Sequence, residues 1–132
     1  MTFEPTPQQH AAITTTGKHL CVDAGAGSGK TSVLVQRILH LLDQGVPLRH
    51  IVAITFTRKA ATEMRERLRR AIHNAPDRDD PASMTKWREL EYQVESARIT
   101  TIDAFCAGLL RENALRIGLD PDFVLMANAE VD

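Results

Sequence analysis

The sequence predicts an α/β fold built around a parallel sheet. A glycine-rich turn, residues 24–31, lies between a short apolar segment and a segment whose apolar residues recur at helical spacing. Further β-branched apolar segments alternate with helical ones along the rest of the 132-residue chain. Strands that alternate with helices pair in parallel, and ligands of such sheets bind at the carboxyl ends of the strands.

Length and composition suit one domain with a core of its own. Hydrophobic residues make up 43% of the chain and charged residues 25%, which excludes the disordered and fibrous classes. The formal net charge is −1, so any site for a polyanion must be a local patch. With no secretory signal and no membrane-spanning run, we expect a cytoplasmic protein without membrane contact. Cys21 and Cys106 lie among apolar residues and are expected to be buried thiols of a reducing compartment.

The first elements are two helices with a strand between them. A helix over residues 6–16 is expected, because Thr6 precedes a proline as an N-cap does and Gly17 ends the pattern. Leu20–Val22 predicts a short buried strand, and Lys30 to about Asp43 the next helix. The apolar residues of that helix are Val33, Leu34, Ile38, Leu41 and Leu42.

A second strand and helix follow. Ile51–Phe56 is a β-branched apolar run, typical of a buried strand. Thr57 is the expected N-cap of a helix over Lys59 to about His73, and residues 74–82 form a polar loop. The inward residues of this helix are Ala60, Ala61, Met64, Leu68 and Ile72.

The last part repeats the alternation. Asp80-Pro81 begins a helix, Arg98–Ile102 is the third strand candidate, and a helix over Asp103–Ile117 ends at Gly118. Phe123–Met126 is expected to be extended. The inward residues of the helix after Asp80 are Trp87, Leu90 and Val94.

The glycine-rich turn fits the phosphate-binding P-loop pattern, with Ala24 in place of the first glycine. Its three glycines allow backbone angles that a Cβ would forbid, so that successive N–H groups can surround a phosphate. Lys30 would reach the β- and γ-phosphates, and Thr31 would offer its hydroxyl to a metal. The alternative is a turn that binds nothing. The pattern predicts ATP and Mg²⁺ as cofactors, held by Ala24, Gly25, Ala26, Gly27, Ser28, Gly29, Lys30 and Thr31.

Four ordered motifs resemble those of a known family. They are residues 7–13 (PQQHAAI), 24–31 (AGAGSGKT), 54–61 (ITFTRKAA) with Met64, and 101–106 (TIDAFC). Together they resemble the start of the first RecA-like domain of UvrD/Rep-type superfamily 1 DNA helicases, and Phe105-Cys106 is closest to the AddA/RecB-like branch. The resemblance implies an incomplete P-loop NTPase (RecA-like) three-layer fold, with residues 1–132 as a single partial ATP-binding helicase domain.

The resemblance also implies functional roles. Gln9 would read the adenine, since its amide donates and accepts at once. The DNA-binding residues would be Thr55, Phe56, Thr57, Arg58 and Lys59, with a base stacked on the phenylalanine. In the intact protein, ATP hydrolysis between two RecA-like domains would drive movement along single-stranded DNA in repair or recombination. The expected partners are single-stranded DNA and the remainder of the helicase or a nuclease–helicase complex.

Each role has a structural alternative. Gln9 could be an exposed helical glutamine, Phe56 a core residue, and the two threonines simple caps. The one basic stretch is either a solvated helix face, which is the commoner case, or a path for DNA. Its members are Arg58, Lys59, Arg65, Arg67, Arg69 and Arg70, against Glu63 and Glu66.

Two positions depart from the family pattern, and one motif is missing. Arg58 stands where the family usually has Asn, and the added cation is compatible with a phosphate track. Asp103 stands where many relatives have His. A cap of the following helix is favoured there, and a degenerate Walker B aspartate that binds Mg²⁺ is the alternative. No Asp-Glu pair follows an apolar strand, which leaves Lys30 and Thr31 as the predicted catalytic residues.

Three functions therefore stay open. The leading one is the ATP-binding region of a DNA helicase, which by itself binds nucleotide weakly with little turnover. The second is a non-enzymatic module that binds nucleotide or single-stranded DNA, or docks on a partner. The third is a small-molecule P-loop kinase, which the absence of lid arginines and the fit of the DNA motifs disfavour.

Overall fold

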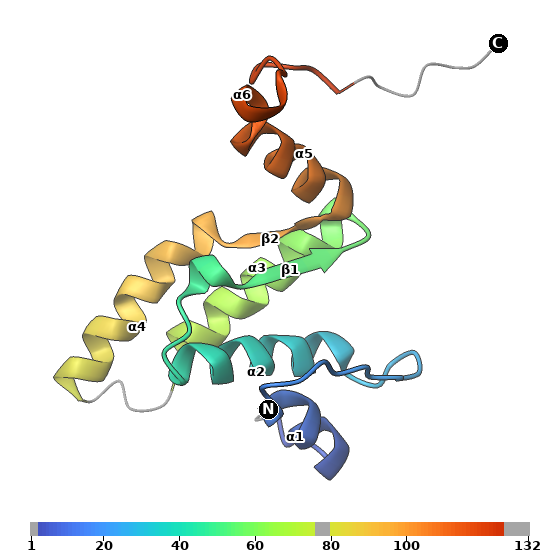
Figure 1. Cartoon of the computed structure of the whole chain (residues 1–132). Helices are drawn as coiled ribbons and strands as arrows, with labels where there is room; N and C mark the ends of the chain where they lie inside the picture. The colour runs from blue at the N-terminus through green and yellow to red at the C-terminus, as the bar shows by residue number, and fades with distance from the viewer. Residues whose placement is uncertain (1–2, 76–79, 126–132) are drawn as a thin grey trace.

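The computed structural model describes residues 3–75 and 80–125, and it shows a mixed helix–strand fold with a small parallel sheet (Figure 1). The strands pair in parallel, as predicted, but two α-helices precede, separate and follow them in place of a strict alternation. The elements are α1 (Pro7–Thr14), α2 (Lys30–Asp43), the 3-10 helix η1 (Leu48–His50), β1 (Val52–Thr55), α3 (Arg58–His73), α4 (Pro81–Gln93), the 3-10 helix η2 (Val94–Ser96), β2 (Arg98–Thr101), α5 (Ile102–Glu112) and α6 (Ala114–Ile117).

The sheet consists of β1 and β2, which run parallel with Ala53 opposite Ile99. These two side chains lie on one face of the sheet and contribute to the core, where α3 packs against both strands. Val52 and Ile54 alternate with them and are exposed on the opposite face. Within the described residues, the core therefore lies on one face of the sheet, and the predicted three-layer arrangement stays a prediction.

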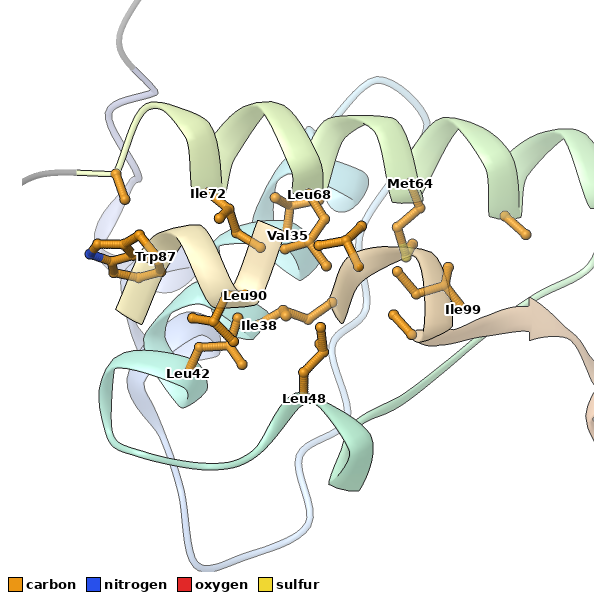
Figure 2. Close-up of a cluster of buried hydrophobic side chains, with 14 residues drawn as sticks. Val35, Ile38, Leu42, Leu48, Met64, Leu68, Ile72, Trp87, Leu90 and Ile99 are labelled. Carbon is orange, nitrogen blue, oxygen red and sulfur yellow. The ribbon is translucent and has the colours of Figure 1, made fainter. Parts of the chain in front are cut away.

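One apolar cluster holds α2, α3, α4 and the sheet together (Figure 2). Met64, Leu68 and Ile72 recur every four residues along α3 and are buried, which confirms its predicted inward face. On α2 the prediction was partly wrong, because Leu34 is exposed and Val35 is buried in its place. The cluster comprises Val35, Ile38, Leu42, Leu48, Ala61, Met64, Leu68, Ile72, Ala75, Trp87, Leu90, Val94, Ala97 and Ile99.

The predicted helix starts are confirmed by their capping bonds. The Thr57 hydroxyl accepts a hydrogen bond from the Ala60 amide at 3.1 Å, and the Asp80 carboxylate accepts one from Ser83 at 2.9 Å. Thr6 caps α1, and it does so reciprocally with Gln9. Side chains of this kind satisfy amides that no intrahelical carbonyl can reach.

The predicted strand Leu20–Val22 is absent from the structure. A strand needs a neighbouring backbone to pair with, and no described backbone group forms a hydrogen bond with this segment. Its side chains are therefore exposed, which also makes the predicted burial of Cys21 wrong. Cys106 is exposed too, because it lies on a side of α5 that no described element covers.

The predicted helix over residues 103–117 is divided into α5 and α6. Asn113 leaves the helical conformation, with φ −113° and ψ 8°, and its side-chain amide donates to the Leu109 carbonyl at 2.9 Å. Gly118 ends α6 with φ +72°, as expected for a helix-terminating glycine. Residues 123–125 form no strand, and Met126, the end of the predicted extended segment, lies outside the described residues.

Candidate nucleotide and DNA site

The glycine-rich turn leads directly into α2. Gly27 and Gly29 have φ values of +74° and +77°, a region that residues with a Cβ adopt at a cost. Gly29 is the N-cap of α2, and the Ser28 amide closes the turn on the Gly25 carbonyl at 3.4 Å. Gly25 itself has no positive φ, so the expected backbone requirement for glycine at this position was wrong.

The turn presents several amide groups without acceptors. The first intrahelical bond of α2 is donated by Val33 to Gly29 at 3.0 Å, which leaves the amides of Lys30, Thr31 and Ser32 outside the helical pattern. None of these three, nor the amides of Ala26, Gly27 and Gly29, donates to an acceptor within the described part of the chain. Amides of this kind at a helix N-terminus attract an anion, since the positive end of the helix dipole reinforces them.

The side chains of Lys30 and Thr31 are placed for the same ligand. The Lys30 ammonium donates to the carbonyls of Ala24 at 3.0 Å and Gly25 at 2.7 Å, so it lies over the turn while remaining exposed. A phosphate would replace neutral carbonyls with charged oxygens, which make stronger bonds. The half-buried Thr31 hydroxyl makes no hydrogen bond to any described residue. The donor set therefore fits a polyphosphate, with Thr31 able to contribute an oxygen to a bound cation.

Gln9 connects α1 to this turn. Its Oε1 accepts a hydrogen bond from the Thr6 amide at 2.9 Å, and its Nε2 donates to the Ser28 carbonyl at 3.0 Å. The residue is half-buried, so the alternative of a merely exposed helical glutamine does not hold. A primary amide has two N–H groups and two lone pairs, which leaves one donor and one acceptor position for a further ligand.

The predicted DNA-binding segment follows the carboxyl end of β1. Thr55 closes the strand, and its hydroxyl donates to the Thr57 carbonyl at 3.0 Å. Phe56 is 99% exposed, so its alternative role as a core residue is wrong. A phenyl ring left in water at the end of a strand is a surface on which an apolar or aromatic group can pack.

The basic stretch of α3 is used mostly within the protein. Arg65 donates to the Ile99 carbonyl at 2.8 Å, while Arg67 pairs with Glu63 at 2.6 Å and Arg69 pairs with Glu95. Three other members make no ion pair or hydrogen bond through their side chains within the described ranges; they are Arg58, Lys59 and Arg70. The stretch as a whole thus favours a structural face, and Arg58 and Lys59 remain available to a phosphate.

Asp103 does not have the capping role that was favoured for it. The Thr101 hydroxyl accepts the hydrogen bond from the Ala104 amide at 3.3 Å and caps α5, whereas Asp103 lies exposed in the first turn. A carboxylate there is still stabilised by the helix dipole. Since β2 ends at Thr101, Asp103 lies on the helix and not at a strand end, which disfavours the Walker B alternative.

The glycine-rich turn and the predicted DNA-binding segment lie on the same side of the molecule. In Figure 1, β1 and β2 point their carboxyl ends toward the side at which α2 begins with the glycine-rich turn. This arrangement follows from the alternation of parallel strands and helices.

Sequence reasoning missed two features along α2. The Arg37 guanidinium of α2 donates to the carbonyls of Ala12 at 2.6 Å and Ile13 at 3.4 Å, and only the folded structure brings these groups together. An open cleft of about 510 Å³ lies between Phe3, α2 and the C-terminal half of α3, and its lining includes Ser32, Gln36 and Arg70. The Phe3 ring reaches within 4.0 Å of the point where a Cβ of Gly29 would stand. Neither feature had a sequence signal, because both depend on contacts between distant segments.

Residues 5–132 match the family described as UvrD/REP helicase N-terminal domain. Among curated relatives, an ATP-dependent helicase/nuclease subunit from Levilactobacillus brevis is 44% identical over 96% of this chain and 10% of its own length. The proteins of the same name from Exiguobacterium sibiricum and Lactobacillus delbrueckii subsp. bulgaricus are 42% and 37% identical over 99% and 98% of this chain, each over 11% of its own length.

These matches confirm the predicted resemblance, including its AddA/RecB-like branch. The chain spans about a tenth of the length of the curated relatives it matches. Separately, no helix within residues 3–75 and 80–125 is long and apolar enough to cross a membrane.

Proposed function

Because the chain belongs to the UvrD/REP helicase N-terminal domain family, we propose that it is the ATP-binding N-terminal region of an ATP-dependent DNA helicase. The helicase translocates on single-stranded DNA in repair or recombination. Residues 1–132 are then part of a RecA-like domain that other segments complete. The observation that carries the proposal is the turn at the start of α2. Six amides there donate to no described acceptor, and the Lys30 ammonium lies over the same turn.

The chain's own groups have distinct tasks toward ATP and Mg²⁺. The amides of Gly27 and of residues 29–32 bind phosphate oxygens, and Lys30 neutralises charge on the β- and γ-phosphates. The Thr31 hydroxyl is a ligand of the cation. Gln9 uses its remaining donor and acceptor for the adenine edge. Bound ATP supplies the phosphoryl group, and transfer of that group to water drives movement of the helicase along DNA.

The DNA track begins at the end of β1. A base stacks on the exposed ring of Phe56, while Arg58 and Lys59 at the start of α3 bind the backbone phosphates. The amides of Arg58 and Lys59, which donate to no described acceptor, add to this attraction at the N-terminus of α3. Movement along DNA requires that ATP hydrolysis changes this contact, and the position of the turn and the DNA segment on the same side of the molecule supports such coupling.

Hydrolysis requires a carboxylate pair that holds the metal and orients the attacking water. In the helicase family this is an Asp-Glu pair after an apolar strand, and residues 1–132 contain no such pair. The isolated chain is therefore proposed to bind ATP with little turnover, and the remainder of a helicase–nuclease to complete the site. The proposed location is the cytoplasm, where the free thiols of Cys21 and Cys106 remain reduced.

The proposal is tested by measuring ATP·Mg²⁺ binding to the wild type and to Lys30→Ala. Hydrogen bonds to charged groups contribute about 1.5–3 kcal/mol, so the variant should bind about 10–150-fold more weakly. Lys18→Ala is the matched control, because Lys18 is exposed outside the turn, and it should bind as the wild type does. Equal affinities of the wild type and Lys30→Ala would remove the claim.

DNA binding is tested by salt titration with a labelled single-stranded oligonucleotide. Contacts with phosphates make the affinity fall steeply as salt increases. Arg58→Ala combined with Lys59→Ala should reduce that salt dependence, because two phosphate contacts are lost. Binding that is absent at low salt would contradict the DNA track.

A further inference from the structure

Helix α1 contributes little to the apolar core. It has only eight residues, too few for a stable isolated helix in water. Its two buried side chains, Ala12 and Ile13, are not part of the main cluster. The position of α1 therefore depends on the packing of this small apolar face against α2 and on its polar contacts with the rest of the chain.

Those polar contacts lie at both ends of α1 and lead to one unit, the glycine-rich turn with α2. Near the N-terminal end, Gln9 Nε2 donates to the Ser28 carbonyl at 3.0 Å. At the C-terminal end, Arg37 Nη1 donates to the carbonyls of Ala12 and Ile13 at 2.6 and 3.4 Å. Because the two contacts lie at opposite ends of this short helix, each one restricts rotation of the helix about the other.

Arg37 binds the C-terminal end of α1, where a positive charge is favourable. The last four carbonyls of a helix lack intrahelical donors, and they form the negative end of the helix dipole. A half-buried guanidinium satisfies two of them and brings a positive charge to that end. Arg37 lies two turns along α2 from Lys30, or about 10 Å, so it does not reach the phosphates.

We propose that Arg37 is a positioning residue for nucleotide selectivity. It holds α1 in place, and α1 carries the Gln9 amide to the edge of the turn where a base is read. The inference rests on the proposed function, because it assigns Arg37 a role in that same site. Its consequence is specific: loss of Arg37 weakens recognition of the base and leaves recognition of the phosphates unchanged.

The test compares ATP with inorganic tripolyphosphate, each with Mg²⁺, on the wild type, Arg37→Met, Arg37→Lys and Gln9→Ala. If Gln9 is correctly placed in about a tenth of Arg37→Met molecules, ATP affinity falls by up to about tenfold and by no more than in Gln9→Ala, because the other molecules still bind the phosphates. Tripolyphosphate affinity stays the same. Arg37→Lys recovers part of the loss, because an ammonium can still donate to one carbonyl. Arg88→Met is the control, since it removes an exposed arginine of α4 and should change neither affinity.

Coupling between the two residues provides a further measurement. Arg37→Met combined with Gln9→Ala should lose no more ATP affinity than Gln9→Ala alone, because both changes remove the same contact. Additive losses would contradict the proposal. So would an equal loss of ATP and tripolyphosphate affinity in Arg37→Met, which indicates general damage to the turn.

A readout without nucleotide separates this inference from the proposed function. Nuclear Overhauser contacts between the Gln9 side-chain amide and the Ser28–Gly29 segment should be present in the wild type and lost in Arg37→Met. If the wild type binds neither ligand, the proposed function fails. If the Overhauser contacts persist in Arg37→Met, the positioning role fails whatever the binding result.

Discussion

The packed body of the molecule and its ligand-facing rim differ in what they bury and what they expose. The body comprises α3, α4 and the inner sides of α2 and the sheet, and no polar or charged residue of the described chain is buried there. The rim comprises residues 24–31 and 55–59, where amides lack acceptors and Phe56 is almost fully exposed. Stability comes from the first region, and groups without partners that could bind ligands are concentrated in the second.

This difference explains why the two regions should respond separately to substitution. Burial of apolar side chains determines the free energy of unfolding, whereas exposed donors and rings contribute little to it. Changes in the body should therefore affect stability, and changes in the rim should affect binding. Each prediction below tests one side of that separation with a matched pair of residues.

The largest effect is expected for Leu68→Ala in the centre of α3. Leu68 has no exposed surface, and truncation of such a leucine costs about 3–5 kcal/mol because it leaves a cavity. Leu34→Ala is the matched control, since Leu34 is 48% exposed on α2 and should cost about 1 kcal/mol or less. Urea denaturation measures both, and equal losses would contradict the assignment of the core.

A smaller effect, on binding alone, is expected for Phe56→Ala. Stacking on an aromatic ring contributes about 1–3 kcal/mol per base, so single-stranded DNA should bind about 5–150-fold more weakly. The free energy of unfolding should stay within about 0.5 kcal/mol. Tyr92→Ala on α4 removes another ring, 80% exposed, and should leave DNA binding unchanged. The same loss in both variants, measured by fluorescence anisotropy, would contradict the stacking role.

Gly29→Ala is the one change in the rim that should lower stability, by less than Leu68→Ala does, because its effect comes from the backbone conformation and not from burial. A Cβ at φ +77° costs about 1–2 kcal/mol, although its nearest neighbour, Gln9 Nε2, would be at an ordinary 3.7 Å. Gly25→Ala is the control, because Gly25 has no positive φ and no described atom lies within 4 Å of the point where its Cβ would stand. Thermal unfolding compares the two, and a loss of equal size at Gly25 would contradict the backbone argument.

Most of the helices in the body could be predicted from local sequence patterns. The four-residue spacing from Met64 to Ile72 and the caps at Thr57 and Asp80 are local signals, and the structure follows them. Lys30–Asp43 forms a helix with the predicted bounds. Local signals failed where a distant partner decides the outcome. Leu20–Val22 has the composition of a strand but no described neighbour, so it forms none.

The rim was predictable in its residues and less so in its contacts. The order of glycines around Lys30 indicates a phosphate site, because few other patterns produce it. That Gln9 would contact Ser28, or that Arg37 would reach the end of α1, cannot be read from spacing, since 19 and 25 residues separate the partners. Thr101, and not Asp103, is the N-cap of α5. The helix begins directly after β2, so the Thr101 hydroxyl at the strand end accepts the capping hydrogen bond.

The central claim is that the amides of the glycine-rich turn bind a triphosphate. Amide-resolved nuclear magnetic resonance during titration with ATP·Mg²⁺ tests it most directly. We predict the largest shift changes at Ala26, Gly27 and residues 29–32, with the amides of Leu68 and Ile72 unchanged. Shift changes that leave the turn unaffected, or that are largest within the core, would contradict the account.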